Sequence, residues 1–128
     1  MNKVSLSLSD RKLMKSQALA KLQDFSKVKV LVIGDIGLDE YINGEVSRIS
    51  QEAPVPVLNV TGTEVRLGLA ANVAQNITSL GASCELVSII GNDDSGEQLN
   101  KLLNKAKIST SLVADASRPT TKLSLIHI

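Results

Sequence analysis

Two stretches of the sequence place polar side chains where a ligand can approach the backbone closely. The run RLGLAANVAQN at residues 66–76 sets a glycine, two alanines and an asparagine at the start of a strongly helical pattern. Small residues allow close approach, and the free N–H groups of a helix start attract polar or anionic groups. The run GDIGLD at 34–39 supplies two carboxylates, and GNDDSG follows at 91–96. We predict that residues 34–39 and 66–76 form a sugar site.

The polar residues of these stretches suit hydrogen bonding to hydroxyl groups. Asp35 and Asp39 follow a β-branched, nearly continuous apolar run at 28–33, which is typical of a strand buried on both faces of a parallel sheet. Ligands of open α/β sheets bind at the carboxyl ends of such strands. Either aspartate could instead cap a turn. Asn72, in the first turn of the following helix, could bind a hydroxyl or form a local Asx cap.

Residues 41–66 interrupt the α/β pattern and predict a small antiparallel excursion. Asn43-Gly44 is a strong turn signal, and polar and apolar residues alternate from Val57 to Val65. A strand layer over the carboxyl edge of the sheet would act as a lid, and its apolar outer face would favour a partner subunit. Arg48 within it could reach an anionic group or be solvated.

The remaining elements complete an α/β fold. An amphipathic helix over residues 13–25, capped by Ser9 or Asp10 and packed outside the site, is expected first, and residues 1–8 are expected to be a disordered tail. The other expected elements are a helix from 70 that ends at Gly81, a buried strand at 85–90, a helix capped by Asp94-Ser95 with an apolar face of Leu99, Leu102, Leu103 and Ala106, and a weaker strand at 108–113.

Composition excludes several classes of protein. The chain has 128 residues, 43% of them hydrophobic and 21% charged, as in a soluble globular domain. A net charge of +1 without a basic run argues against nucleic-acid binding. The apolar runs are too short to span a membrane, and no secretory signal is visible, so we expect a cytoplasmic protein. The single cysteine, Cys84, lies among apolar residues and is expected in the core.

Four motifs carry a family resemblance over about residues 20–122. VLVIGDIGLD at 30–39, SRISQEAPVPV at 47–57, GLAANVA at 68–74 and GNDD at 91–94 resemble the ribokinase-like (PfkB) carbohydrate kinases. The second motif is similar to that of the heptose 7-phosphate kinases within the family. The resemblance implies the N-terminal part of a three-layer ribokinase-like fold. One departure is visible, since Leu69 stands where the family has the second glycine of a Gly-Gly pair.

The resemblance also implies roles for individual residues. Asp39, Gly68 and Asn72 match positions that line the sugar site of the family, and Asp35 and Arg48 are further candidates for substrate binding. The excursion at 41–66 matches a lid that often pairs in a homodimer. The implied substrate is a small sugar phosphate, with no nucleic acid or membrane partner.

The implied reaction transfers the γ-phosphoryl group of ATP, with Mg²⁺, to the C1 hydroxyl of D-glycero-D-manno-heptose 7-phosphate, for ADP-heptose and lipopolysaccharide core synthesis. The family's Gly-Ala-Gly-Asp segment with the catalytic base is absent here. We therefore expect this fragment to bind neither ATP nor Mg²⁺ and to be inactive alone. Another PfkB sugar kinase and a non-catalytic dimerising α/β module are alternatives. A dinucleotide-binding module is disfavoured because Gly34-Asp35-Ile36-Gly37 lacks the G-x-G-x-x-G spacing.

The last six residues differ in character from the rest. Leu123 to Ile128 read LSLIHI, which resembles the translation of a transposase-end adapter used in sequencing libraries. We therefore expect the kinase-like part to comprise residues 9–122 and residues 123–128 to derive from an adapter. A natural terminal strand is the alternative, and the nucleotides that code for these residues would decide.

Overall fold

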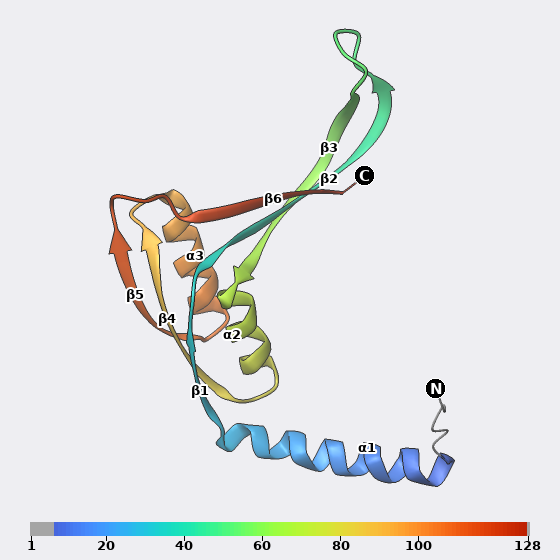
Figure 1. Cartoon of the computed structure of the whole chain (residues 1–128), viewed down its shortest axis with the longest axis vertical. Helices are drawn as coiled ribbons and strands as arrows, with labels where there is room; N and C mark the ends of the chain where they lie inside the picture. Colours follow the sequence, from blue (N-terminus) through green and yellow to red (C-terminus); the bar gives the residue numbers. More distant parts are fainter. Residues whose placement is uncertain (1–6, 128) are drawn as a thin grey trace, which may run out of the picture.

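The computed structural model describes residues 7–127 as two three-stranded sheets with helices between and beside them (Figure 1). The first sheet is parallel in the order β1-β4-β5, and comprises β1 (Lys29–Ile33), β4 (Ser83–Gly91) and β5 (Ser109–Asp115). The predicted α/β class and the three parallel strands are confirmed. Among residues 7–127 no helix is long and apolar enough to cross a membrane.

The second sheet has the order β3-β2-β6. The long strands β2 (Ile36–Ile49) and β3 (Pro56–Leu69) are antiparallel, and β6 (Thr121–His127) runs parallel to β2. Figure 1 shows the far half of the β2–β3 hairpin extending away from the other elements. Residues 123–127 thus form part of an edge strand. Their origin from an adapter stays a prediction for the coding nucleotides to test.

The core lies where α2 (Ala70–Ser79) and α3 (Asp94–Lys105) pack between the first sheet and the base of the hairpin. Leu38 and Leu67 are cross-strand partners on β2 and β3, and both are buried. The other buried members are Ile36, Ala71, Ala74, Cys84, Leu86, Leu99, Leu103 and Ile108. The predictions of a buried Cys84 and an apolar face on α3 are confirmed, and burial raises the pKa of the Cys84 thiol.

The prediction that the first strand is buried on both faces is wrong for these residues. Alternate side chains of β1 are exposed, with Leu31 at 58% and Ile33 at 72% exposure. Ile89 of β4 and Val113 of β5 are exposed too. Because α2 and α3 cover only one face of the parallel sheet, no element within residues 7–127 shields the other. A continuous apolar run in the sequence indicates a strand that can be buried on both faces. It does not indicate whether other elements cover both faces.

The predicted turn at Asn43-Gly44 is also wrong. Both residues lie inside β2, where the pairing with β3 shifts register, because Asn43 pairs with Gly62 and Gly44 with Val60. A β-bulge uses the same permissive residues as a turn, so the local signal does not separate the two. The chain reverses instead at 50–55, and the hairpin begins at Ile36 rather than at 41.

The first helix, α1 (Leu8–Gln23), is confirmed as a helix but not as a packed one. Ser7, not Ser9 or Asp10, is its N-cap, and the Asp10 side chain completes the capping box. No residue of α1 is buried, and Figure 1 shows α1 apart from the two sheets. The short 3₁₀ helix η1 (Asp24–Lys27) follows α1 and precedes β1. Of the expected disordered tail, Leu8 begins this helix and Ser7 caps it, and residues 1–6 lie outside the described residues.

Asp93 joins the start of α3 to the segment that enters β6. One carboxylate oxygen accepts a hydrogen bond from the backbone N–H of Gly96 at 2.8 Å, and the other accepts one from the backbone N–H of Thr120 at 2.8 Å. The Gly91 N–H donates to the Thr120 hydroxyl at 2.9 Å. Asp93 is therefore the N-cap of α3, one residue before the predicted Asp94-Ser95.

The hydrogen bonds among Gly91, Asp93, Gly96 and Thr120 form a clamp between two chain segments, and glycine is required at position 91 of this clamp. A Cβ atom added there would lie 2.6 Å from the backbone nitrogen of Thr120 and 2.7 Å from the carbonyl oxygen of Arg118. Both are backbone atoms, which cannot move aside as a flexible side chain can. The clamp thus explains the Gly-x-Asp pattern at 91–93 as a crossing point of two chain segments.

Leu69, just before α2, has an unusual backbone conformation. Its φ of 56° and ψ of −133° fall in a region that favours glycine, and no side chain caps the helix from this position. The α2 helix begins directly afterwards and ends as predicted, with Gly81 at a φ of 94°. The leucine that departs from the family's Gly-Gly pattern is therefore strained.

Replacing Leu69 by glycine should stabilise the protein. The side chain is 42% exposed, so little apolar burial is lost, and we expect the free energy of unfolding to rise by about 1 kcal/mol after the entropic cost of glycine. Urea unfolding would measure it. Leu80→Gly is the matched control, because Leu80 is similarly exposed but has a φ of −80°, and it should not stabilise. An unchanged or lower midpoint for Leu69→Gly would contradict the strain.

The clamp should make stability depend on pH. Hydrogen bonds from Thr120 and Gly96 hold the pKa of Asp93 below its usual value. A carboxyl whose pKa is lower in the folded state stabilises fully above its unfolded pKa of about 3.9, and that contribution is lost as the pH falls through the folded pKa. In urea unfolding from pH 7 to pH 3, Asp93→Ala should be less stable at pH 7 and lose less on acidification. Asp94→Ala, the control, should keep the wild-type acid dependence; the same dependence in Asp93→Ala would refute the assignment.

Candidate functional site

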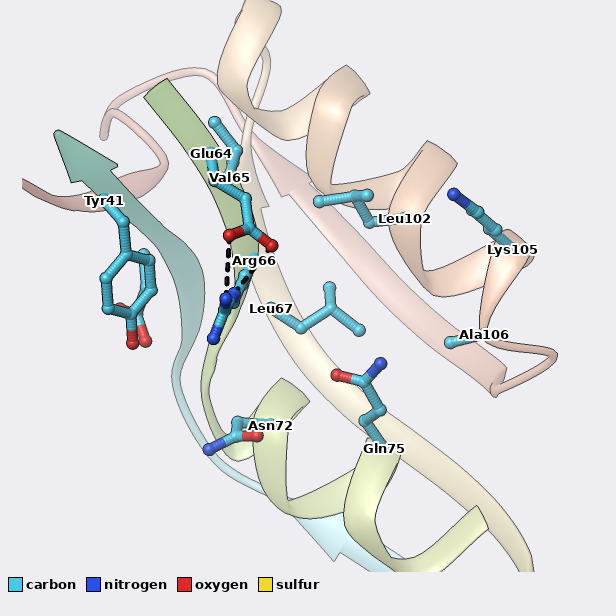
Figure 2. Close-up of a pocket in the computed structure, with 11 residues that line it drawn as sticks. Tyr41, Glu64, Val65, Arg66, Leu67, Asn72, Gln75, Leu102, Lys105 and Ala106 are labelled. Atoms are coloured by element: carbon cyan, nitrogen blue, oxygen red, sulfur yellow. Dashed lines mark hydrogen bonds and ion pairs between the residues drawn. The ribbon is translucent and has the colours of Figure 1, made fainter. Parts of the chain in front are cut away.

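A cavity of about 570 Å³ lies between the hairpin and the two core helices (Figure 2). Its size is within the range of small-molecule sites. Its lining comes from β2, β3, α2 and the end of α3: Asp39, Tyr41, Glu64, Val65, Arg66, Leu67, Asn72, Gln75, Leu102, Lys105 and Ala106. Figure 2 shows Leu67 and Gln75 directed into the space between β3, α2 and α3. Two of the predicted sugar-binding residues, Asp39 and Asn72, therefore share one cavity.

Gly68 makes room for the Asp39 carboxylate. In the antiparallel ladder Asp39 pairs with Arg66, and Gly37 pairs with Gly68. A Cβ atom added to Gly68 would lie 2.5 Å from Oδ1 of Asp39 and 2.8 Å from its carboxyl carbon. The third predicted site residue thus acts through the absence of a side chain, since it lets the carboxylate lie over the β3 backbone at the cavity wall.

The α2 helix contributes two amides to the same cavity. Asn72 lies in the first turn and Gln75 one turn later, so both side chains project from one face of the helix. Both are exposed, and each amide carries donors and an acceptor for hydroxyl groups. Gln75 could have been predicted from the sequence, because it lies three residues after Asn72 in the expected helix and so on the same face.

A cationic group stands at the hairpin wall of the cavity. Arg66 donates from Nε to Glu64 at 2.8 Å and from Nη2 to Glu64 at 2.7 Å, and its guanidinium carbon lies 4.8 Å from the centre of the Tyr41 ring (Figure 2). Hydrogen bonds from Arg66 lower the pKa of the Glu64 carboxyl, and Glu64 raises the pKa of the Arg66 guanidinium. Both side chains are therefore charged across the physiological range.

The sequence did not reveal Tyr41 or Lys105 as lining residues, and Arg66 lay at the start of the predicted run 66–76 without a role of its own. Tyr41 and Arg66 come to the cavity only through the register of β2 and β3, and predicting a turn at 43–44 places them incorrectly. Lys105 follows Leu102 by three residues on α3, but the direction of that helix relative to the hairpin is a tertiary feature.

Two other predicted site residues lie outside this cavity. Asp35 is at the end of β1, where its exposed carboxylate is 4.0 Å from Nη2 of Arg118 and its carbonyl accepts a hydrogen bond from Ala70. Arg48 is exposed in the far half of β2, close to the turn of the hairpin. Their substrate contacts stay predictions without support from this geometry.

The residues described here do not form a metal centre. Within 7–127, no group of three or more histidine, cysteine, aspartate and glutamate side chains is placed to hold a metal ion. The ring of His127, the single histidine, stacks on Tyr41 with centroids 5.5 Å apart. The acidic, cysteine and histidine side chains of residues 7–127 are therefore not arranged as a binding site for Mg²⁺.

The fold is that of the PfkB carbohydrate kinases. The pfkB family of carbohydrate kinases matches residues 27–128, most of the sequence, and the chain belongs to that family. The match extends through residues 123–128.

The similar curated proteins are much longer. The chain is 49% identical over 102 residues to the bifunctional protein HldE of Rhodopseudomonas palustris (strain HaA2). The matched region covers 79% of this chain and 21% of that relative. It is 47% identical over 96 residues to the D-beta-D-heptose 7-phosphate kinase of Bordetella bronchiseptica. That match covers 75% of this chain and 31% of that enzyme. It thus spans between a fifth and a third of their lengths.

Solved structures support the ribokinase-like fold. The fructokinase of Halothermothrix orenii superposes with a TM-score of 0.58 at 28% identity, over 77% of this chain and 34% of that one. The predicted membership of the family and the predicted fold are confirmed.

Substituting Gly68 should displace the Asp39 carboxylate. In Gly68→Ala the added methyl group occupies the place of Oδ1, so we expect the Asp39 carboxyl ¹³C resonance to move. Gly62→Ala on the same strand is the matched control, because a Cβ atom there meets nothing within 4 Å. Carboxyl-detected NMR of the two variants would measure the change. An unmoved Asp39 resonance in Gly68→Ala would show that the carboxylate is not seated over Gly68.

Proposed function

We propose that the chain supplies the sugar-binding wall of a heptose 7-phosphate kinase. The observation that carries this proposal is that Asp39 and Asn72 share one cavity, with Gly68 making room for Asp39. The relatives named as heptose 7-phosphate kinase and HldE support the substrate class.

In the proposed complex each polar group has a distinct task. The Asp39 carboxylate accepts hydrogen bonds from sugar hydroxyls, and the Asn72 amide can both donate to them and accept from them. Leu67, Leu102 and Ala106 give the cavity an apolar wall for the C–H faces of the sugar. These contacts orient the sugar, and holding a reactant in the correct geometry is one contribution to phosphoryl transfer.

The proposed reaction is transfer of the γ-phosphoryl group of ATP to the C1 hydroxyl of the bound heptose 7-phosphate. Such transfer needs a base to orient the hydroxyl and groups that stabilise charge on the phosphoryl group, usually with Mg²⁺. Residues 7–127 supply the proposed sugar wall, but they form no group of carboxylates placed to hold a metal ion. We therefore propose that this chain binds the sugar phosphate and does not catalyse its phosphorylation alone.

We also propose that the β2–β3 hairpin pairs with a second copy in the longer protein. Apolar side chains in and near its far half are exposed, among them Val46, Ile49, Val55 and Val60. An apolar strand surface of this kind favours association. A cytoplasmic location follows for an enzyme that acts on ATP and a soluble sugar phosphate.

Calorimetric titration of the 128-residue chain with D-glycero-β-D-manno-heptose 7-phosphate tests the sugar site. Asp39→Asn and Asn72→Ala should each weaken binding about 2- to 10-fold, the effect of losing one hydrogen bond. Asn76→Ala is the matched control, because Asn76 is exposed on α2 but does not line the cavity. Unchanged affinity in both site variants would remove these residues from the site. Tighter binding of an unrelated sugar phosphate would point to another substrate in the family.

A further inference from the structure

We propose that Asn43 is a site of spontaneous covalent modification, at which the Asn43-Gly44 pair converts to aspartate and isoaspartate and so changes the far half of the β2–β3 hairpin. The sequence predicts a turn at this pair, but the structure places it inside β2. The reaction needs water and no bound sugar, so it is independent of the proposed function.

The reaction is a ring closure between the Asn43 side chain and the next peptide nitrogen. After the Gly44 N–H gives its proton to hydroxide, the nitrogen forms a bond to Cγ of Asn43. The Cγ–Nδ2 bond breaks, and the departing nitrogen takes a proton from water and leaves as ammonia. Water then opens the cyclic imide. Cleavage between the nitrogen and Cγ gives aspartate, and cleavage between the nitrogen and the main-chain carbonyl carbon gives isoaspartate.

The reacting groups are accessible to each other and to solvent. The Asn43 side chain is exposed, and within residues 7–127 no hydrogen bond holds its amide. Gly44 has no Cβ atom that would hinder the approach of its nitrogen to Cγ. A Cβ atom at position 44 would lie 2.6 Å from the carbonyl oxygen of Asn59, so the β2–β3 ladder itself requires glycine after Asn43.

Regular strand pairing is interrupted at this peptide group. The last described pair between β6 and β2 is His127 with Asn43. The register with β3 shifts at the same point, so that Thr61 has no partner on β2. Among residues 7–127, β2 has β3 as its sole partner beyond Asn43, and Figure 1 shows this part of the hairpin away from the other elements. A segment with few packed neighbours opens locally at low free energy, which gives the backbone the freedom that ring closure requires.

Thr61 makes the reacting nitrogen easier to deprotonate. Its hydroxyl donates a hydrogen bond to the carbonyl oxygen of Asn43 at 3.2 Å. That oxygen and the Gly44 nitrogen belong to one conjugated peptide group, so the negative charge left by the lost proton is shared between them. A hydrogen bond to the charged form of an acid favours its ionisation. The hydroxyl of Thr61 therefore assists the attack of the nitrogen on Cγ.

The modification alters the far half of the hairpin and spares the cavity. In isoaspartate the main chain runs through the side-chain carbon, which adds a methylene group between residues 43 and 44. Because pairing depends on the alternation of residues along a strand, this insertion disturbs the pairs that follow it. Residues 44–49 and 56–60 then lose their present register, whereas the Leu38–Leu67 and Asp39–Arg66 pairs precede the insertion.

Peptide mass spectrometry of the folded 128-residue chain, sampled over days at mildly alkaline pH, tests the proposal. Cleavage after lysine and arginine gives peptide 30–48, with Asn43 as its single asparagine, and peptide 49–66, with Asn59 as its single asparagine. Asn59 is the matched control, because it is exposed on the same hairpin but precedes the β-branched Val60. We expect Asn43 to convert about tenfold faster than Asn59. In Asn43→Gln, peptide 30–48 should keep its mass over the same time.

Variants of Thr61 test the contribution of the facing strand. Thr61→Val should slow the conversion about 2- to 10-fold, the effect of one hydrogen bond, and Thr61→Ser, which keeps the hydroxyl, should convert at the wild-type rate. Thr63→Val is the control, because Thr63 is exposed on the same strand but lies opposite Ile42, before the register shift. An unchanged rate in Thr61→Val would remove the assigned role of Thr61.

The same measurement in urea separates the chemistry of the pair from its place in the fold. Conversion of Asn43 in the folded chain, ahead of Asn59, is the expected result. Equal rates at the two asparagines of the folded chain, or conversion of Asn43 only when urea unfolds the protein, would show that the strand protects the pair and would overturn the proposal.

Discussion

The register of β2 against β3 is the constraint on which the candidate site depends. It sets Leu38 opposite Leu67 in the core, and it sets Asp39 opposite Arg66 beside the cavity. It also brings Gly68 beneath the Asp39 carboxylate and delivers the chain to the start of α2 at Ala70. Because side chains alternate along a strand, a slip of one residue would exchange these two sets. Core packing and the placement of polar groups in the cavity are thus fixed by the same ladder.

Much of the chain could be predicted from local sequence. The parallel strands at 85–90 and 108–113, the apolar face of α3 and the end of α2 at Gly81 follow from short-range periodicity and from a residue that tolerates positive φ. The sequence predicts Asp39, Gly68 and Asn72 as site residues because glycine and polar residues cluster where a strand ends or a helix begins, and the structure brings Asp39 and Asn72 to one cavity. The family followed from four motifs and is confirmed over residues 27–128.

The remainder depends on tertiary context that local patterns do not contain. Asn43-Gly44 has the composition of a turn, but the long hairpin uses it as a bulge because pairing continues on both sides. Arg66 and Tyr41 enter the cavity through that pairing, and Lys105 through the docking of α3. The cap of α3 shifts to Asp93 because this carboxylate also holds the distant Thr120. The exposed faces of β1 and α1 follow from what packs against them, which apolar content alone does not state.

The central claim is that the cavity between the hairpin, α2 and α3 binds a sugar phosphate. Amide NMR of the ¹⁵N-labelled 128-residue chain, recorded while heptose 7-phosphate is added, tests it most directly. The account predicts saturable shifts that cluster at residues 39–41, 64–68 and 72–75. Shifts confined to the separate cavity near Cys84 and Lys107, or no saturable shifts in a folded chain, would contradict it.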